Sequence, residues 1–279
     1  MKKKILLVVT VIMTAVSLIA CGDSSEKSKE TGVHKSSEST SSKTEQNRSE
    51  EDTTKEVNND VSDITEEKLR SHPETDASYF KTTTSRQSMH GVEGEIAITG
   101  YEGPDSMVVI PEEIDGKKVV AIEYLGTENI AALLVPKSVI RVCEDAFMSS
   151  YNLKLVVFEE GINSIGNGAF LACRKLETVI LPETLESIGA TAFASTAINK
   201  IELPDKIKEI PQYAFDSLEE LTITVGDNIE SVNIFAFNES NNITIIVKEG
   251  TKSMEAIEKY NKEASPDDKE TPLLNIQNK

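Results

Sequence analysis

Between residues 94 and 250 the hydrophobic positions of the chain recur with a short and almost constant period. The clearest mark of the repeat is the dipeptide Ala-Phe, which returns in one register at spacings of 23, 23, 22 and 22. An aliphatic residue lies five and eight positions before each of these phenylalanines. We expect the phenylalanines to form one core column, each ring stacked on those of the neighbouring repeats. The column consists of Phe147, Phe170, Phe193, Phe215 and Phe237.

Each repeat also contains a short stretch in which apolar side chains alternate with period two, which is typical of a strand with one buried face. A proline closely follows this stretch at Pro111, Pro136, Pro182 and Pro204, and it ends the strand because it has no N–H to donate. The repeat is too short for paired helices and suits one strand plus a compact return. The sequence therefore predicts a solenoid whose parallel β-sheet forms one face. The apolar pairs expected to point inward are Leu133/Val135, Val156/Phe158, Val179/Leu181, Ile201/Leu203, Ile223/Val225 and Ile245/Val247.

The segment 176–193, LETVILPETLESIGATAF, resembles the BspA-like leucine-rich repeat family, and Cys173 falls on that family's cysteine position. The resemblance covers about residues 94–250. It implies a leucine-rich repeat solenoid with short irregular, β or 3-10 return segments. It also implies a bacterial surface protein that binds other proteins or serves in adhesion, with no catalytic residues.

Three features depart from the family pattern. The first unit has Glu123-Tyr124 near the Ala-Phe register, and it contains an insertion, Asp115–Lys118, that we interpret as a small turn in an N-terminal cap. Cys143 takes the usual glycine position.

The segments on either side of the repeats predict two short helices. In the flank 62–93, Asp63-Ile64-Thr65-Glu66 is a candidate capping box for a helix through Leu69, followed by an irregular or extended stretch from Tyr79 and Phe80. In the segment 251–279, residues 251–264 predict a helix with Met254, Ile257 and Tyr260 on one side. That helix would cover the last repeat, whose core is otherwise exposed.

The N-terminus has the pattern of an export signal. Three lysines precede Ile5–Ala20, a stretch without charge that is too short to span a bilayer comfortably. Leu18-Ile19-Ala20-Cys21 resembles the lipobox of bacterial lipoproteins, which implies removal of residues 1–20 and diacylglycerylation of Cys21. We therefore expect a protein anchored to the cell membrane at the cell surface through an N-terminal lipid. The alternative is an uncleaved signal anchor.

Residues 21–61 predict a disordered tether behind the lipidated cysteine. Of the forty residues 22–61, fourteen are Ser or Thr and sixteen are charged. Such a segment cannot bury enough apolar surface to offset the entropy lost on ordering. We expect it to hold the folded part away from the membrane.

Charge and the scarcity of reactive side chains exclude several functions. The formal net charge of −18 argues against binding to nucleic acid, or to an anionic bilayer except through the lipid anchor. The three histidines all precede the repeats, which argues against a Ser-His or Cys-His nucleophile. Cys143 and Cys173 lack the second pair that a zinc site needs, and we interpret them as small buried thiols rather than a disulfide. We therefore expect no enzymatic activity, no cofactor and no metal.

The strand alternation also identifies a candidate partner-binding face. Residues between the inward pairs must point out of the sheet, and in the first repeats they form an apolar row. The row consists of Val109, Leu134, Val157 and Ile180, with Leu155 in the neighbouring column. Two hypotheses stay open: a partner protein binds this row, or the flank with Leu69, Tyr79 and Phe80 folds back over it. Simple β-propensity is a weaker third explanation.

The favoured function is a lipid-anchored binding module whose partner is a host or bacterial surface protein. The alternatives are a structural spacer of the cell envelope and, less favoured, a solute-binding lipoprotein of a transporter. The last class expects two α/β lobes, which the short repeat contradicts.

Overall fold

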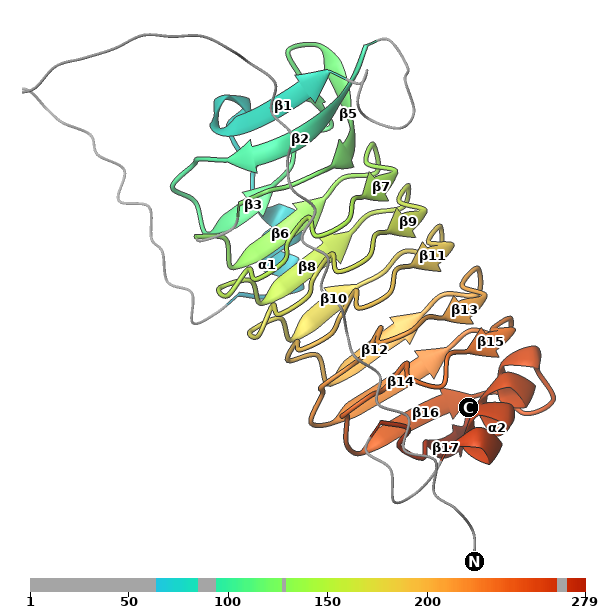
Figure 1. Ribbon diagram of the computed structural model, residues 1–279. Helices are drawn as coiled ribbons and strands as arrows, with labels where there is room; N and C mark the ends of the chain where they lie inside the picture. The colour runs from blue at the N-terminus through green and yellow to red at the C-terminus, as the bar shows by residue number, and fades with distance from the viewer. Residues whose placement is uncertain (1–63, 85–93, 127–128, 265–269) are drawn as a thin grey trace, which may run out of the picture. The chain divides into compact units, whose positions relative to one another are not determined.

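The computed structural model describes residues 64–84, 94–126, 129–264 and 270–279 (Figure 1). All of them lie in one compact unit, Lys55–Lys279. The predicted signal peptide, Cys21 and the predicted tether of residues 21–61 lie outside the described residues, as do residues 85–93 of the flank.

The described unit is a solenoid whose main strands lie side by side on one face, as the repeat predicts (Figure 1). Neighbouring strands of this face pair in parallel, and equivalent positions of successive repeats lie side by side. Leu133 thus lies beside Val156, and Ile201 lies beside Ile223. These strands form two four-stranded sheets. The first contains β3 (Met107–Val109), β6 (Ala132–Val135), β8 (Leu155–Phe158) and β10 (Thr178–Ile180), and the second contains β12 (Lys200–Leu203), β14 (Leu221–Val225), β16 (Ile243–Val247) and β17 (Asn275–Asn278).

The return segments form a second, shorter ladder of parallel strands. It runs through β5 (Lys117–Ile122), β7 (Arg141–Val142), β9 (Ser164–Ile165) and β11 (Ser187–Ile188), and separately through β13 (Glu209–Ile210) and β15 (Ser231–Val232).

Both ladders are interrupted at the same level of the stack. In the described residues no hydrogen-bonded pairing joins β10 to β12 or β11 to β13. The interruption coincides with a change of period, since the step from Phe193 to Phe215 is one residue shorter than the step from Phe170 to Phe193. The Ala-Phe turns remain bonded across it, because the amide of Phe193 donates to the carbonyl of Ala214 at 3.0 Å.

The phenylalanine column forms the core, as predicted. All five rings are fully buried, and successive rings stack with centroids 4.9 to 5.9 Å apart and planes within 14° of parallel. The Tyr260 ring meets Phe237 edge-on at 5.8 Å and ends the column. Stacking of the repeats therefore buries apolar side chains that no single repeat could bury.

The N-terminal cap is more regular than its sequence suggests. The stretch from Tyr79 and Phe80, expected to be irregular or extended, contains η2 (Ala77–Tyr79) and β1 (Phe80–Thr84), and β1 pairs antiparallel with β2 (Glu95–Tyr101). The inserted turn joins β4 (Glu113–Ile114) to β5 as an antiparallel hairpin. Asp115 and Gly116 occupy its tip with positive φ of 53° and 71°, a conformation that Asp-Gly adopts readily.

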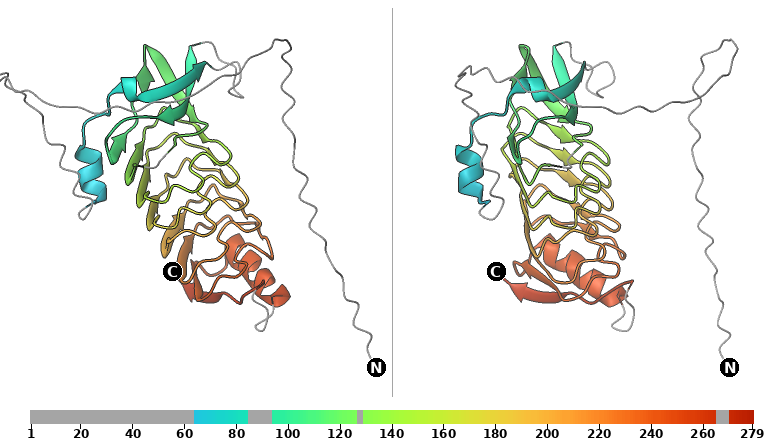
Figure 2. Two further views of the ribbon diagram at one scale, coloured as in Figure 1. Left: turned by 60° about the vertical axis from the view of Figure 1, so that its left-hand side comes forward. Right: turned by 90° about the vertical axis from the view of Figure 1, so that its left-hand side faces the viewer.

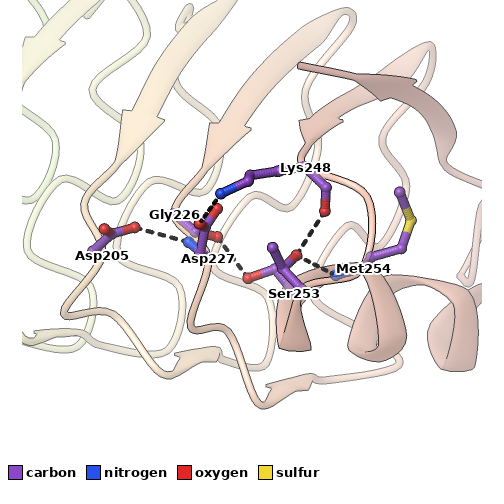
Figure 3. Close-up of polar contacts among 7 residues, drawn as sticks. Asp205, Gly226, Asp227, Lys248, Ser253 and Met254 are labelled. Carbon is purple, nitrogen blue, oxygen red and sulfur yellow. Dashed lines mark hydrogen bonds and ion pairs between the residues drawn. The ribbon is translucent and has the colours of Figure 1, made fainter.

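The C-terminal helix, α2 (Lys252–Glu263), covers the last repeat as predicted, with Ile257 and Tyr260 buried. Figure 3 shows how its first turn docks: the Ser253 hydroxyl donates to the carbonyl of Gly226 at 2.6 Å. The same oxygen accepts from the amide of Ile229 at 2.8 Å. Lys248 forms an ion pair with Asp227 at 3.2 Å beside this contact. Ser253 thus satisfies backbone groups that would otherwise be left without partners at the end of the stack.

Candidate functional site

The apolar row on the first sheet is covered by α1 (Glu66–Ser71), which Figure 2 shows lying against the outer face of the strands. Leu69 of this helix is fully buried and packs into the row. The resulting cluster is separate from the phenylalanine core. Its buried members are Leu69, Val109, Ala132, Leu134, Leu155 and Val157, with Ile64, Met107 and Ile180 partly buried at its margin.

Local hydrogen bonds define both ends of this covering segment. Thr65 caps the helix, accepting from the amide of Lys68 at 3.3 Å, so the predicted cap at Asp63 is wrong by two residues. After the helix, Thr75 pairs with the edge strand β3: its amide donates to the carbonyl of Val109, and its hydroxyl accepts from the Val109 amide, both at 3.0 Å. Because these hydrogen bonds fix both ends of the segment, the single buried side chain of the helix, Leu69, is enough to cover the apolar row.

The prediction of an exposed binding row is therefore corrected. Val109, Leu134 and Leu155 are at most 7% exposed and Val157 is completely buried, while Ile180 is half-buried. Between the two open hypotheses, the structure favours the covering flank, and Leu69 does the covering. Tyr79 and Phe80 take no part in this, because their rings pack against Tyr101 in the cap.

We expect Leu69→Ala to release α1 from the sheet while leaving the solenoid folded. Truncating a buried leucine removes about 2–5 kcal/mol, and an isolated helix shorter than about 12 residues has little stability of its own. Hydrogen exchange should show lost amide protection in α1, with the exposed Glu67→Ala as the control on the same helix. Unchanged protection in Leu69→Ala would show that Leu69 does not hold the helix.

Beyond α1 the same face of the sheet is open. The outward side chains of β10, β12, β14, β16 and β17 are half-buried or exposed, and they mix threonines with isoleucines and one charged pair. In that pair Lys200 and Glu202 lie 3.4 Å apart on β12. We call this surface the open strand face. It comprises Thr178, Ile180, Lys200, Glu202, Thr222, Thr224, Thr244 and Ile246, with Asn275 and Gln277 of β17 beside Thr244 and Ile246.

A second surface feature lies among the turns of the first coils. An open hollow of about 720 Å³ is lined by loops that follow β2, β5 and the first Ala-Phe turn. Tyr124 and Tyr151 line it with 55% and 58% of their surface exposed, and Met148 with 45%. We call it the aromatic hollow. The remaining described residues that line it are Tyr101, Glu102, Gly103, Gly126, Asn129, Ser149, Ser150 and Asn152.

Comparison with known proteins agrees with this geometry. Residues 125–261 match the family model of the BspA type leucine-rich repeat region in six copies. These residues are BspA-type leucine-rich repeats. Among curated proteins, none matches the chain in sequence.

Solved structures of bacterial leucine-rich repeat proteins are similar to these BspA-type repeats. The leucine-rich repeat protein of T. pallidum (TpLRR) is 24% identical over 62% of this chain and 86% of that chain, with a TM-score of 0.52. A leucine-rich repeat protein from Bacteroides ovatus is 18% identical over 61% of this chain, with a TM-score of 0.45, and the match spans 58% of that protein.

The two cysteines of the BspA-type repeats are free thiols in the structure, but Cys143 is only half-buried, so the interpretation of small buried thiols holds for Cys173 alone. Cys173 is completely buried and donates to the carbonyl of Phe147 at 3.0 Å, and burial raises its pKa to about 12. Burial also raises the pKa of Cys143, against a smaller opposite effect of Arg141. Both thiols are therefore protonated at neutral pH, which makes them poor nucleophiles.

No cluster of metal-ligating side chains and no helix able to cross a membrane occurs among the residues that the structure describes.

The aromatic hollow was not found from the sequence, because its side chains come from three loops of successive coils. A signal does exist within the repeat. The position four residues after the repeat phenylalanine is exposed in every coil, and only in the first does it hold an aromatic side chain, Tyr151. Its counterparts are Arg174, Ala197, Glu219 and Asn241.

Proposed function

We propose that this protein is a lipid-anchored bacterial surface protein that binds another protein through the open strand face. The observation that carries the proposal is that α1 covers only the first strands of the sheet and leaves the later ones accessible. The five open strands present side chains in regular rows, with threonine and isoleucine beside a charged pair. Such a mixture of apolar contact area and hydrogen-bonding groups is what protein interfaces use. The partner is a surface protein of the host or of a bacterium.

Site-specific crosslinking on intact cells tests the binding face. A photoreactive amino acid at position 202 should capture a discrete partner, because Glu202 points out of β12. Position 209 is the matched control, since Glu209 is also an exposed glutamate of the same coil but lies on β13 in the other ladder. Equal capture at both positions, or none at either, contradicts binding through the open strand face and favours a structural spacer of the envelope.

The lipid anchor is tested separately. Cys21→Ser should leave an unprocessed precursor that does not incorporate radioactive palmitate, because the lipobox cysteine supplies the thiol that is acylated. Stable anchoring requires two or more acyl chains, so the variant should also leave the membrane fraction if its signal is cleaved elsewhere. Cys143→Ser is the control and should label like the wild type. Palmitate retained in Cys21→Ser would contradict the lipoprotein assignment.

A further inference from the structure

Three of the five large hydrophobic side chains that are exposed in the described part of the chain gather in the aromatic hollow. They are Tyr124, Met148 and Tyr151, and they reach it from two different coils. None of them packs into the phenylalanine core or into the cluster beneath α1. Exposed aromatic rings that contribute little to the fold, placed together on loops, indicate a binding site.

The internal repeat shows that the fold does not require this arrangement. Tyr151 lies four residues after Phe147, and the same exposed position accepts arginine, alanine, glutamate and asparagine in the later coils. The position of Met148 holds Leu171, Ala194, Asp216 and Asn238 in the later coils, so it stays apolar in the next two coils and becomes polar after them. The aromatic character is therefore specific to the first coils, whereas the buried columns repeat along the whole stack.

The polar groups of the hollow are mostly uncharged. Asn129, Asn152 and Ser149 offer amide and hydroxyl groups, and Tyr101 brings its phenol to the wall. Burial, together with the nearby Asp105 carboxylate, raises the pKa of Tyr101 to about 12, so its hydroxyl stays neutral. An ordered set of neutral donors and acceptors beside aromatic rings suits a ligand that has many hydroxyl groups and apolar patches.

The described lining of the hollow carries little charge. Among the described residues of its lining only Glu102 carries a charge, and Lys81 forms an ion pair with it. Lys175, which is not part of the lining, donates to the uncharged Asn152 side chain at 2.9 Å. Among the described residues of the lining, the one charged side chain is thus paired, which favours a neutral ligand.

From these observations we infer that the aromatic hollow is a binding site for a neutral oligosaccharide. The Tyr124 and Tyr151 rings contact the apolar faces of sugar rings, and the side-chain amides and hydroxyls bind the sugar hydroxyls. The volume of about 720 Å³ lies in the range of ligand sites, and the open form admits a chain of sugars rather than a single enclosed one. This site is distinct from the open strand face, so the protein would bind a glycan and a protein at different places.

Isothermal titration calorimetry of the purified protein tests the inference with cellohexaose, maltohexaose, chitohexaose and mannohexaose as probes. We expect at least one to bind at millimolar concentration or below. Tyr151→Ala should weaken that binding about tenfold, the loss expected when an anchoring tyrosine is removed. Tyr151→Phe should retain most of the affinity because it keeps the ring.

Arg174→Ala is the matched control, since Arg174 occupies the position of Tyr151 in the next coil, and it should bind like the wild type. Tyr151 and Arg174 are both exposed, so each variant should keep the thermal midpoint of the wild type if its fold is intact. Failure of all four hexaoses to bind, or equal binding by Tyr151→Ala, would overturn the inference. Binding of hexalysine that Tyr151→Ala abolishes would also overturn it, by assigning the hollow to a basic peptide. These results test only the aromatic hollow. The proposed protein binding through the open strand face is tested separately, by crosslinking at position 202.

Discussion

Phe193→Ala should destabilise the domain by about 3–5 kcal/mol, the usual cost of truncating a buried aromatic side chain to alanine. Phe193 is fully buried between Phe170, 5.6 Å away, and Phe215, 5.7 Å away. Its neighbours in the chain, Ala192 and Ala194, are too small to fill the space that the ring would leave. The contact with Phe215 crosses the level at which both strand ladders are interrupted, so the ring stack and the hydrogen bonds of the Ala-Phe turns join the coils there without a continuous sheet beside them.

Urea unfolding followed by circular dichroism measures this effect. Phe235→Ala is a suitable control, because Phe235 is only half-buried and contacts Tyr213 outside the main column. Its loss of unfolding free energy should be clearly smaller. A thermal midpoint of Phe193→Ala within a degree or two of the wild type would show that the phenylalanine column does not carry the stability of the core.

Gly161→Ala should be comparably damaging, for a reason that concerns the backbone. Gly161 has a positive φ of 146°, which side-chain-bearing residues rarely adopt. A methyl group added there would lie 2.0 Å from the carbonyl oxygen of Lys137 in the preceding coil. Backbone strain and overpacking each cost about 1–3 kcal/mol, so together they should remove about 3 kcal/mol or more.

The carbonyl cannot move away freely, because the two coils are joined around it. The amide of Glu159 donates to the carbonyl of Val135 at 2.9 Å, and the amide of Lys137 donates to the Glu159 carboxylate at 3.2 Å. Gly250→Ala is the matched control: its φ is also positive, at 75°, but no atom lies within 4 Å of the added methyl group. If both variants lose the same free energy of unfolding, the close approach of the Lys137 carbonyl is not the reason why position 161 requires glycine.

The repeat could be predicted from the sequence because its signals are local and are copied along the chain. The Ala-Phe register, the alternating strand residues and the helix containing Tyr260 each follow from spacing and side-chain type alone. The strand β17 could not be found in this way. Its Asn275 and Asn278 have weak strand preference, and the segment pairs because the edge of β16 is open to it.

The candidate binding row shows a different limit of sequence analysis. Strand alternation correctly placed Val109, Leu134 and Val157 on the outer side of the sheet, yet it could not decide what covers them. That outcome depends on Leu69, in a helix of six residues that is too short to show a periodic pattern. Its position is set by tertiary contacts, including the pairing of Thr75 with β3. Outward orientation on a strand is therefore not the same as exposure to solvent.

The shared interruption of the two ladders determines how cooperative the domain is. The stability of a stacked repeat protein is approximately a sum of terms for each repeat and for each interface between neighbours. The interface between the coils of β10 and β12 lacks both strand pairings and is joined by the hydrogen bonds of the Ala-Phe turns and by the ring stack, so we expect its coupling to be weaker than that of the other interfaces. We therefore expect the coils before and after it to behave as two cooperative units. A variant that destabilises one unit should unfold that unit first, so its loss of unfolding free energy is read from the first of two urea transitions.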